Sequence, residues 1–272
     1  MLKRYEKHWM VKQMGKAKID QAFKQVLDRG DKAFVPYIMA GDGGLDQLDE
    51  QLAFLEEAGA TVVELGIAFS DPVADGPTIQ EAGLRALANG VSLSAVLETL
   101  KKSKAERKIP IVLMTYINPI HTYGIEAFAK SCEEAGVDGL IIPDLPLEEE
   151  RLIVPTLQEN KIALIRLAAL TSTEERLTEI AKRTEGFLYA VTVTGTTGAR
   201  ASFQDELGAH LASLREKSNA PVLAGFGVST PEHVRSLTEH CDGVIVGSKI
   251  VDSLYKGDRK VIRELIESAQ LN

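Results

Sequence analysis

Hydrophobic positions along the chain follow two alternating periodicities. Short runs rich in β-branched residues are typical of buried parallel strands, and a longer segment with apolar residues at helical spacing follows each run. Eight such runs begin near Ala33, Thr61, Ile111, Val137, Ile162, Phe187, Pro221 and Gly243. Eight strands that alternate with helices predict an α/β protein with a single (β/α)8 barrel, the TIM-barrel architecture. The long gap between the second and third runs predicts extra helical elements.

Start signals support the predicted helices. Ser172 and Glu175 have the spacing of a capping box, and Thr230 followed by Pro231 places a hydroxyl cap before a proline. The competing architecture is a doubly wound open sheet, which usually carries a glycine fingerprint after its first strand. Residues 41–44 read GDGG there and lack that fingerprint. The barrel is therefore favoured.

The N-terminal segment differs in charge from the rest of the chain. Residues 1–18 carry six basic side chains and one acidic side chain, Glu6. They lack the apolar core of a secretion signal. This pattern predicts a basic tail or leading helix over residues 1–18, followed by one barrel domain over residues 19–272.

Composition limits the partners and the compartment. Across the chain, 31 Lys and Arg residues stand against 39 Asp and Glu, a formal net charge of −8, which disfavours nucleic acid as a partner. The apolar runs are far shorter than the roughly 20 residues that a membrane helix needs, so no membrane partner is expected. Cys132 and Cys241 form no paired spacing and favour a reducing cytoplasm.

The second predicted strand carries the strongest chemical signal. Residues 62–77 read VVELGIAFSDPVADGP, which places Glu64 in a buried strand and Asp75 on the loop beyond it. An ion pair inside the barrel would explain a buried Glu, and a tight turn would explain the Asp. The functional alternative is a general acid and base pair. In that interpretation, apolar neighbours raise the pKa of Glu64, and a wetter loop keeps Asp75 ionised.

Glycine turns follow the last three predicted strands. They contain Gly198, Gly227 and Gly247, and Ser248 begins a predicted helix. Glycines let main-chain N–H groups approach an anion, and a helix N-terminus adds its positive end. Each glycine alone is typical of a tight turn, but many barrels bind phosphate with the loops after strands 7 and 8. Together these turns predict a phosphate site, and no Walker motif accompanies them.

Metal ligands and aromatic pockets complete the candidates. The five histidines show no paired ligand spacing, so we expect no metal. Tyr37, Tyr116 and Tyr189 each fall on or just after a strand. Aromatic residues at such positions either pack in the core or line a pocket for a flat apolar ligand.

Four segments resemble the tryptophan synthase alpha subunit family. They are FVPYIMAGD from Phe34, ELGIAFSDPVADGPTIQ from Glu64, PDLP from Pro143 and GFGVSTPE from Gly225. The resemblance covers about residues 34–254. It implies a lyase of tryptophan biosynthesis that cleaves indole-3-glycerol phosphate to indole and glyceraldehyde 3-phosphate, without a cofactor in this chain. It also implies catalytic roles for Glu64 and Asp75. The substrate-binding residues that it implies are Tyr37, Tyr116, Tyr189, Gly198, Gly227, Gly247 and Ser248.

The resemblance further implies a partner, a beta subunit that uses pyridoxal phosphate, in a complex of two alpha and two beta chains. We expect the loops around Asp71 and around Asn118 and Pro119 to contact it, since proline-ordered loops lose less entropy on docking. Ala68 stands where the family usually has proline, which predicts a less ordered loop.

Two alternatives stay open. One is another phosphosugar barrel enzyme, such as indole-glycerol phosphate synthase, which is expected to use a barrel lysine that the predicted strands here lack. The other is a non-catalytic protein that binds the phosphate ligand in order to regulate a beta subunit.

Overall fold

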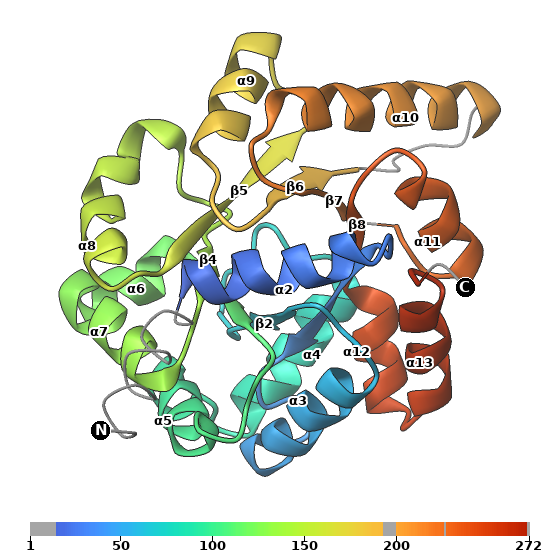
Figure 1. The fold of residues 1–272 in the computed structure, drawn as a ribbon. Helices are drawn as coiled ribbons and strands as arrows, with labels where there is room; N and C mark the ends of the chain where they lie inside the picture. Colours follow the sequence, from blue (N-terminus) through green and yellow to red (C-terminus); the bar gives the residue numbers. More distant parts are fainter. Residues whose placement is uncertain (1–14, 193–199, 226, 271–272) are drawn as a thin grey trace, which may run out of the picture.

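Eight parallel strands form a closed barrel in sequence order, and β8 pairs with β1 (Figure 1). The computed structural model describes residues 15–192, 200–225 and 227–270, without the side chains of residues 200–205. The strands are β1 (Ala33–Met39), β2 (Val63–Gly66), β3 (Ile111–Met114), β4 (Gly139–Ile141), β5 (Ala163–Ala169), β6 (Leu188–Val191), β7 (Val222–Gly225) and β8 (Gly243–Val246). Every strand starts within two residues of its predicted position, so the predicted (β/α)8 barrel is confirmed.

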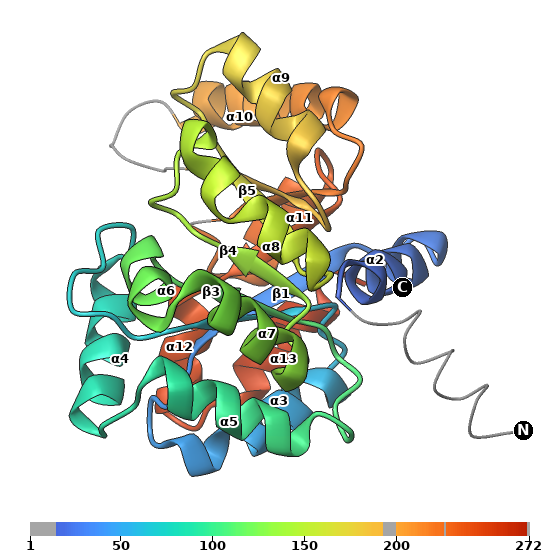
Figure 2. The same cartoon turned by 90° about the vertical axis from the view of Figure 1, so that its left-hand side faces the viewer.

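Helices surround the barrel on all sides (Figures 1 and 2). They are α2 (Lys16–Asp28), α3 (Leu48–Glu57), α4 (Pro77–Ala88), α5 (Leu93–Ser103), α6 (Ile117–Tyr123), α7 (Ile125–Ala135), α8 (Val154–Glu159), α9 (Glu174–Arg183), α10 (Arg200–Lys217), α11 (Pro231–Thr238), α12 (Ser248–Tyr255) and α13 (Arg259–Glu267). Two short 3-10 helices, η1 (Leu45–Gln47) and η2 (Leu147–Leu152), precede α3 and α8. The long gap between β2 and β3 holds α4 and α5, as predicted. Among the described helices, none has the length and apolarity needed to cross a membrane.

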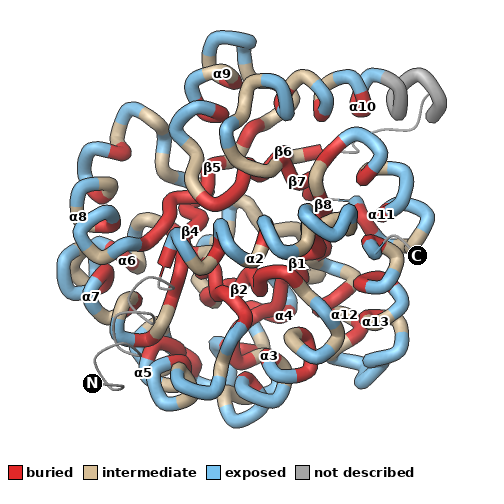
Figure 3. Tube along the Cα trace, in the orientation of Figure 1, coloured by how far each residue is buried: buried red, intermediate tan, exposed pale blue. Residues whose placement is uncertain are grey.

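Two faces of the strands build two layers of core, because successive side chains in a strand point to opposite faces. One set of residues fills the barrel interior and includes Val35, Val62, Val112, Ile165 and Ile245. The alternate residues pack outward against the helices. Figure 3 shows this arrangement as buried strands inside helices whose outer surfaces are exposed. The interior is therefore packed, and open space for a ligand is expected only at an end of the barrel.

Helix α2 closes the end of the barrel at which the strands begin (Figure 1). Its Ile19 and Phe23 are buried against the interior residues, and the ring of Phe23 lies 5.5 Å from that of Phe187. In Figure 2, α2 lies on one side of the barrel, whereas α6, which follows β3 directly, lies on the other. The carboxyl ends of the strands therefore face away from α2.

Asp138, immediately before β4, holds the start of α2. Its Oδ1 accepts a hydrogen bond from the Gly15 amide, and its Oδ2 accepts one from the Ile111 amide, both at 3.0 Å. The Lys18 ammonium lies 3.4 Å from the same carboxylate. Helix α2 thus begins at Lys16, inside the predicted tail of residues 1–18. Residues 1–14 lie outside the described residues, so the division of the chain at residue 19 stays a prediction.

A buried ion pair fixes the outer layer near β5. Arg166 points outward from β5, and its guanidinium bonds both carboxylate oxygens of Glu150 in η2, at 2.6 and 2.8 Å. Both side chains are only 9% exposed. A bidentate pair of this kind satisfies both charges and ties the segment before α8 to the barrel.

Local details differ from the sequence prediction at two places. The N-cap of α9 is Thr173, whose hydroxyl accepts from the Arg176 amide, so the predicted capping role of Ser172 is wrong by one residue. Asn118 and Pro119 belong to the first turn of α6 and not to a loop. A proline is tolerated there, since the amide groups of a first helical turn have no acceptor within the helix. The Thr230 cap of α11 is confirmed.

We expect Asp138→Ala to lower the free energy of unfolding by about 2 to 4 kcal/mol, since two buried amides lose their acceptor. Urea unfolding of the full chain measures this change. Asp28→Ala is the matched control, because Asp28 pairs with Lys24 on the exposed face of α2. The control should change stability by less than about 0.5 kcal/mol. Equal effects of the two substitutions would show that Asp138 does not hold α2.

Candidate active site

Glu64 lies in the barrel interior on β2, between Tyr37 of β1 and Val112 of β3 in the strand register. Its side chain is 1% exposed, and neither carboxyl oxygen has a hydrogen-bond partner among the described residues. Burial, and then the charge of Asp75, raise the pKa of Glu64 to about 8. The predicted ion pair inside the barrel is therefore absent from the described residues, and the carboxyl group carries its proton at neutral pH.

Asp75 lies on the loop between β2 and α4. The turn is fixed by main-chain hydrogen bonds from Val73 to Asp71 and from Asp75 to Pro72. Burial raises the pKa of Asp75 to about 6, against the opposing effect of a hydrogen bond from Tyr116. The pKa values of the two acids thus follow the predicted order. The Asp75 side chain is more buried than the prediction assumed, however, so its pKa is raised as well.

Tyr116 connects this loop to the end of β3. Its hydroxyl oxygen accepts a hydrogen bond from the Ala74 amide at 3.0 Å, and the hydroxyl donates to the Asp75 carboxylate. Its ring packs against Phe69, with the centroids 5.3 Å apart. Tyr116 therefore holds Asp75 in position in addition to contributing an aromatic surface. The effect of Ala68 on the order of this loop stays a prediction.

Two other tyrosines lie across glycines of neighbouring strands. A Cβ atom at Gly66 would lie 1.9 Å from the hydroxyl oxygen of Tyr37, and one at Gly225 would lie 2.3 Å from the ring of Tyr189. Burial raises the pKa of both phenols, and the charges of Glu64 and Asp75 raise them further. Sequence reasoning missed the role of Gly66 and interpreted Gly225 only as part of a glycine turn. An isolated glycine at the end of a strand was the available signal, since it marks a close approach of another group.

The glycine turns after β7 and β8 leave the barrel side by side. Gly225 of β7 pairs with Ile245 of β8, and Gly227 and Gly247 each stand two residues further along. Gly227 has a φ of 76°, which favours glycine. Gly247 directly precedes α12, which begins at Ser248 as predicted. The first amides of a helix have no acceptor within it and are available to an anion.

The same end of the barrel therefore carries Glu64, Asp75, the three tyrosines and the turns at Gly227, Gly247 and Ser248. Gly198 lies outside the described residues. Thr192 links the ends of β6 and β7, since its amide and its hydroxyl both donate to the Gly225 carbonyl oxygen, at 2.9 and 2.6 Å. This contact fixes the end of β6, which carries Tyr189, against the end of β7, which leads to the turn at Gly227.

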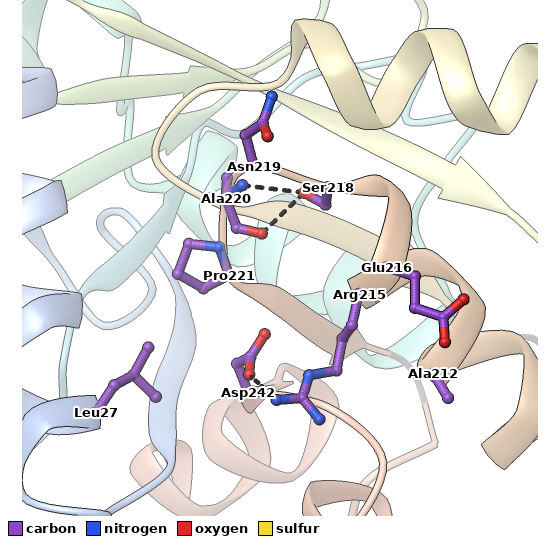
Figure 4. A pocket seen from close by; sticks show the side chains of 9 residues that line it. All are labelled: Leu27, Ala212, Arg215, Glu216, Ser218, Asn219, Ala220, Pro221 and Asp242. Atoms are coloured by element: carbon purple, nitrogen blue, oxygen red, sulfur yellow. Dashed lines mark hydrogen bonds and ion pairs between the residues drawn. The ribbon is translucent and has the colours of Figure 1, made fainter.

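The described residues contain no group of three or more His, Cys, Asp or Glu side chains that could hold a metal ion. A surface hollow occurs at the starts of β7 and β8, on the side of α2 (Figure 4). Its Arg215 and Asp242 pair with each other at 3.0 Å, so their charges are mutually satisfied. None of the predicted site residues lines it.

The fold and the site define a TIM-barrel enzyme with acid and base groups at the carboxyl ends of its strands. A profile of the tryptophan synthase alpha chain family matches residues 23–272, and the chain belongs to that family.

Named relatives agree over almost the full length. The tryptophan synthase alpha chain of Oceanobacillus iheyensis is 57% identical over 256 residues, which cover 94% of this chain and 98% of that one. The Bacillus cereus protein of the same name is 52% identical, with 93% and 96% covered. The crystal structure of tryptophan synthase subunit alpha from Legionella pneumophila superposes with a TM-score of 0.84 at 32% identity, and covers 94% of this chain and 98% of its own.

The predicted class and activity are therefore confirmed. The chain is a carbon–carbon lyase of tryptophan biosynthesis, and the alpha subunit cleaves indole-3-glycerol phosphate to indole and glyceraldehyde 3-phosphate. The alternative of another phosphosugar barrel is excluded by this membership.

Glu64→Gln should stabilise the protein at alkaline pH. The pKa of Glu64 is higher in the fold (about 8) than its ordinary value of 4.5, so the folded state holds an extra proton and loses stability as the pH rises between these values. Glutamine does not ionise. We expect the variant to exceed the wild type by about 2 to 4 kcal/mol at pH 8 and to match it below pH 4.5. Denaturant unfolding across this range measures the difference.

The control is Glu81→Gln, which replaces an exposed acid on α4 and should leave the dependence of stability on pH unchanged. A Glu64→Gln variant that is less stable than the wild type at every pH would contradict the view that Glu64 is buried without a compensating partner.

Proposed function

We propose that Glu64 and Asp75 perform the acid–base chemistry of this cleavage. The observation that carries the proposal is the unpartnered, protonated Glu64 carboxyl at the carboxyl end of the barrel, with a second acid of lower pKa beside it. A purely structural acid in this position would be expected to have an ion-pair or hydrogen-bond partner. Free carboxyl oxygens in a buried position are suited to a proton exchange with substrate.

In the first step, Glu64 gives its proton to C3 of the indole ring. The ring nitrogen then carries positive charge, and the ionised Asp75 accepts the hydrogen bond of the N–H group. In the second step, the Glu64 carboxylate takes the proton of the hydroxyl group on the carbon attached to C3. The bond between this carbon and C3 breaks, its electron pair returns to the ring, and indole and glyceraldehyde 3-phosphate are formed. Glu64 ends the cycle protonated, so it needs no external proton.

The other predicted residues bind the substrate in this proposal. Tyr37, Tyr116 and Tyr189 line the space for the indole ring and the glycerol chain. The turns at Gly198, Gly227 and Gly247, with the α12 N-terminus at Ser248, hold the phosphate group. A dianion at a helix N-terminus is stabilised by free amides and by the helix dipole, which makes the phosphate an anchor for positioning the scissile bond.

The proposal also includes a beta subunit as partner and the cytoplasm as location. The chain acts without a cofactor of its own, in a complex of two alpha and two beta subunits whose beta chains carry pyridoxal phosphate. Asp71 and Val73 in the loop after β2 are exposed, Val73 to 82%, and Asn118 is exposed on α6. These positions are suited to contact with a beta subunit. The two buried free thiols, Cys132 and Cys241, support a cytoplasmic location.

Indole release from indole-3-glycerol phosphate tests the catalytic role. We expect Glu64→Gln to lower kcat at least about 100-fold, because the acid and the later base are both lost. Binding of an analogue without the reactive hydroxyl should change less than about twofold. Glu81→Gln is the control and should retain full activity. The assay is run with and without beta subunit, since a non-catalytic regulator would release no indole even as the wild-type chain.

The pH profile of kcat/KM tests the division of roles, since this quantity reports the pKa values of the free enzyme. Activity requires ionised Asp75 and protonated Glu64, so the profile should be bell-shaped with limbs near pH 6 and pH 8. Asp75→Asn should remove the acid limb and lower the residual rate. It should also move the alkaline limb to lower pH, because the Asp75 charge helps to raise the pKa of Glu64. A profile that is flat between pH 5 and pH 9 would contradict these assignments.

A further inference from the structure

Tyr37 presents a second polar group without a partner beside Glu64. No hydrogen bond of its hydroxyl is found among the described residues, and its side chain is 5% exposed. We infer that the Tyr37 hydroxyl is a positioning group for Glu64, which donates a hydrogen bond to the Glu64 carboxylate once this carboxyl has given its proton to the substrate. The inference rests on the proposed role of Glu64 and adds a role that pocket lining does not require.

The strand register places the two side chains side by side. Tyr37 of β1 pairs with Glu64 of β2. Each stands two residues beyond an interior valine, Val35 and Val62, so the alternation of side chains along a strand directs both toward the barrel interior. The phenol extends toward the carboxyl end of the barrel until its oxygen lies over Gly66, two residues beyond Glu64 on the same face of β2. The Glu64 side chain leaves the neighbouring position of β2, and its charge acts on the Tyr37 phenol. The hydroxyl and the Glu64 carboxyl therefore belong to neighbouring side chains at the carboxyl end of β1 and β2.

Gly66 makes this placement possible. A Cβ atom there would lie 1.9 Å from the hydroxyl oxygen and 2.4 Å from the adjoining ring carbon, so any other residue would displace the phenol. The hydroxyl also stays a donor throughout the working pH range, because burial and the neighbouring charges of Asp75 and Glu64 hold the pKa of Tyr37 well above its ordinary value.

The surroundings of Glu64 leave few other donors. From β3 it faces the apolar Val112, from its own loop the acid Asp75, and from β6 the phenol of Tyr189. The Tyr116 hydroxyl already donates to Asp75. An ionised Glu64 in this apolar setting needs a donor, since an unpartnered buried charge is costly. Tyr37 supplies this donor after Glu64 has lost its proton. In the resting enzyme Glu64 is protonated and has no hydrogen bond from Tyr37.

The test is Tyr37→Phe in the full chain, assayed with and without beta subunit. Loss of the donor disfavours the ionised Glu64, so kcat at pH 7 should fall about three- to tenfold while KM changes less than about twofold. The alkaline limb of the pH profile should move up by about half a unit to one unit. Tyr123→Phe is the matched control, because the Tyr123 hydroxyl bonds Ser131 away from the site. It should change neither quantity.

A packing role would raise KM or lower stability and leave the alkaline limb in place, which would overturn the inference. A limb that moves in Tyr189→Phe and not in Tyr37→Phe would assign the donor to Tyr189 and would overturn it as well. Gly66→Ala, which retains the hydroxyl but displaces it, should move the limb in the same direction as Tyr37→Phe. The proposed function is tested separately, since an active Glu64→Gln enzyme would refute it whatever Tyr37 does.

Discussion

The burial of one carboxyl group without a partner is the constraint on which the site depends. Glu64 lies in a barrel interior filled largely by apolar residues, where ionisation is unfavourable and the group keeps its proton. The roles of the residues on the neighbouring strands depend on this carboxyl group. Tyr37 lies beside it in the register, and Gly66 leaves the space into which the phenol extends. Stability is sacrificed at this position, which is typical of a functional site.

The two ends of the barrel divide stability from chemistry. At the end where strands begin, helix α2 covers the interior and the Asp138 carboxylate is fully used by amides and by Lys18. At the other end, the Glu64 carboxyl is left unused within the described residues. A satisfied buried acid stabilises the fold, whereas an unsatisfied one is available to a substrate. The same residue type thus serves opposite purposes according to the end of the barrel at which it lies.

Much of the fold was predictable because a buried parallel strand and an amphipathic helix leave distinct patterns in a sequence. The strand starts were found within two residues, and the hydroxyl cap at Thr230 was recognised from the proline after it. The cap of α9 was misplaced by one residue, since Ser172 and Thr173 both suit that role and only the backbone conformation selects Thr173. Asp138 and the Arg166–Glu150 pair were missed, because partners 16 to 123 residues apart leave no local pattern.

The sequence by itself determined the barrel, the family and the residue types at the carboxyl ends of the strands, since periodicity and local motifs are properties of neighbouring residues. Only the tertiary structure decided how these residues combine. It raised the pKa of Asp75 by partly burying this side chain on a loop that is otherwise half-buried or exposed, and it engaged Tyr116 with that loop. It also laid Tyr37 over Gly66. Burial and contacts between strands depend on the closure of the barrel, which no local segment encodes.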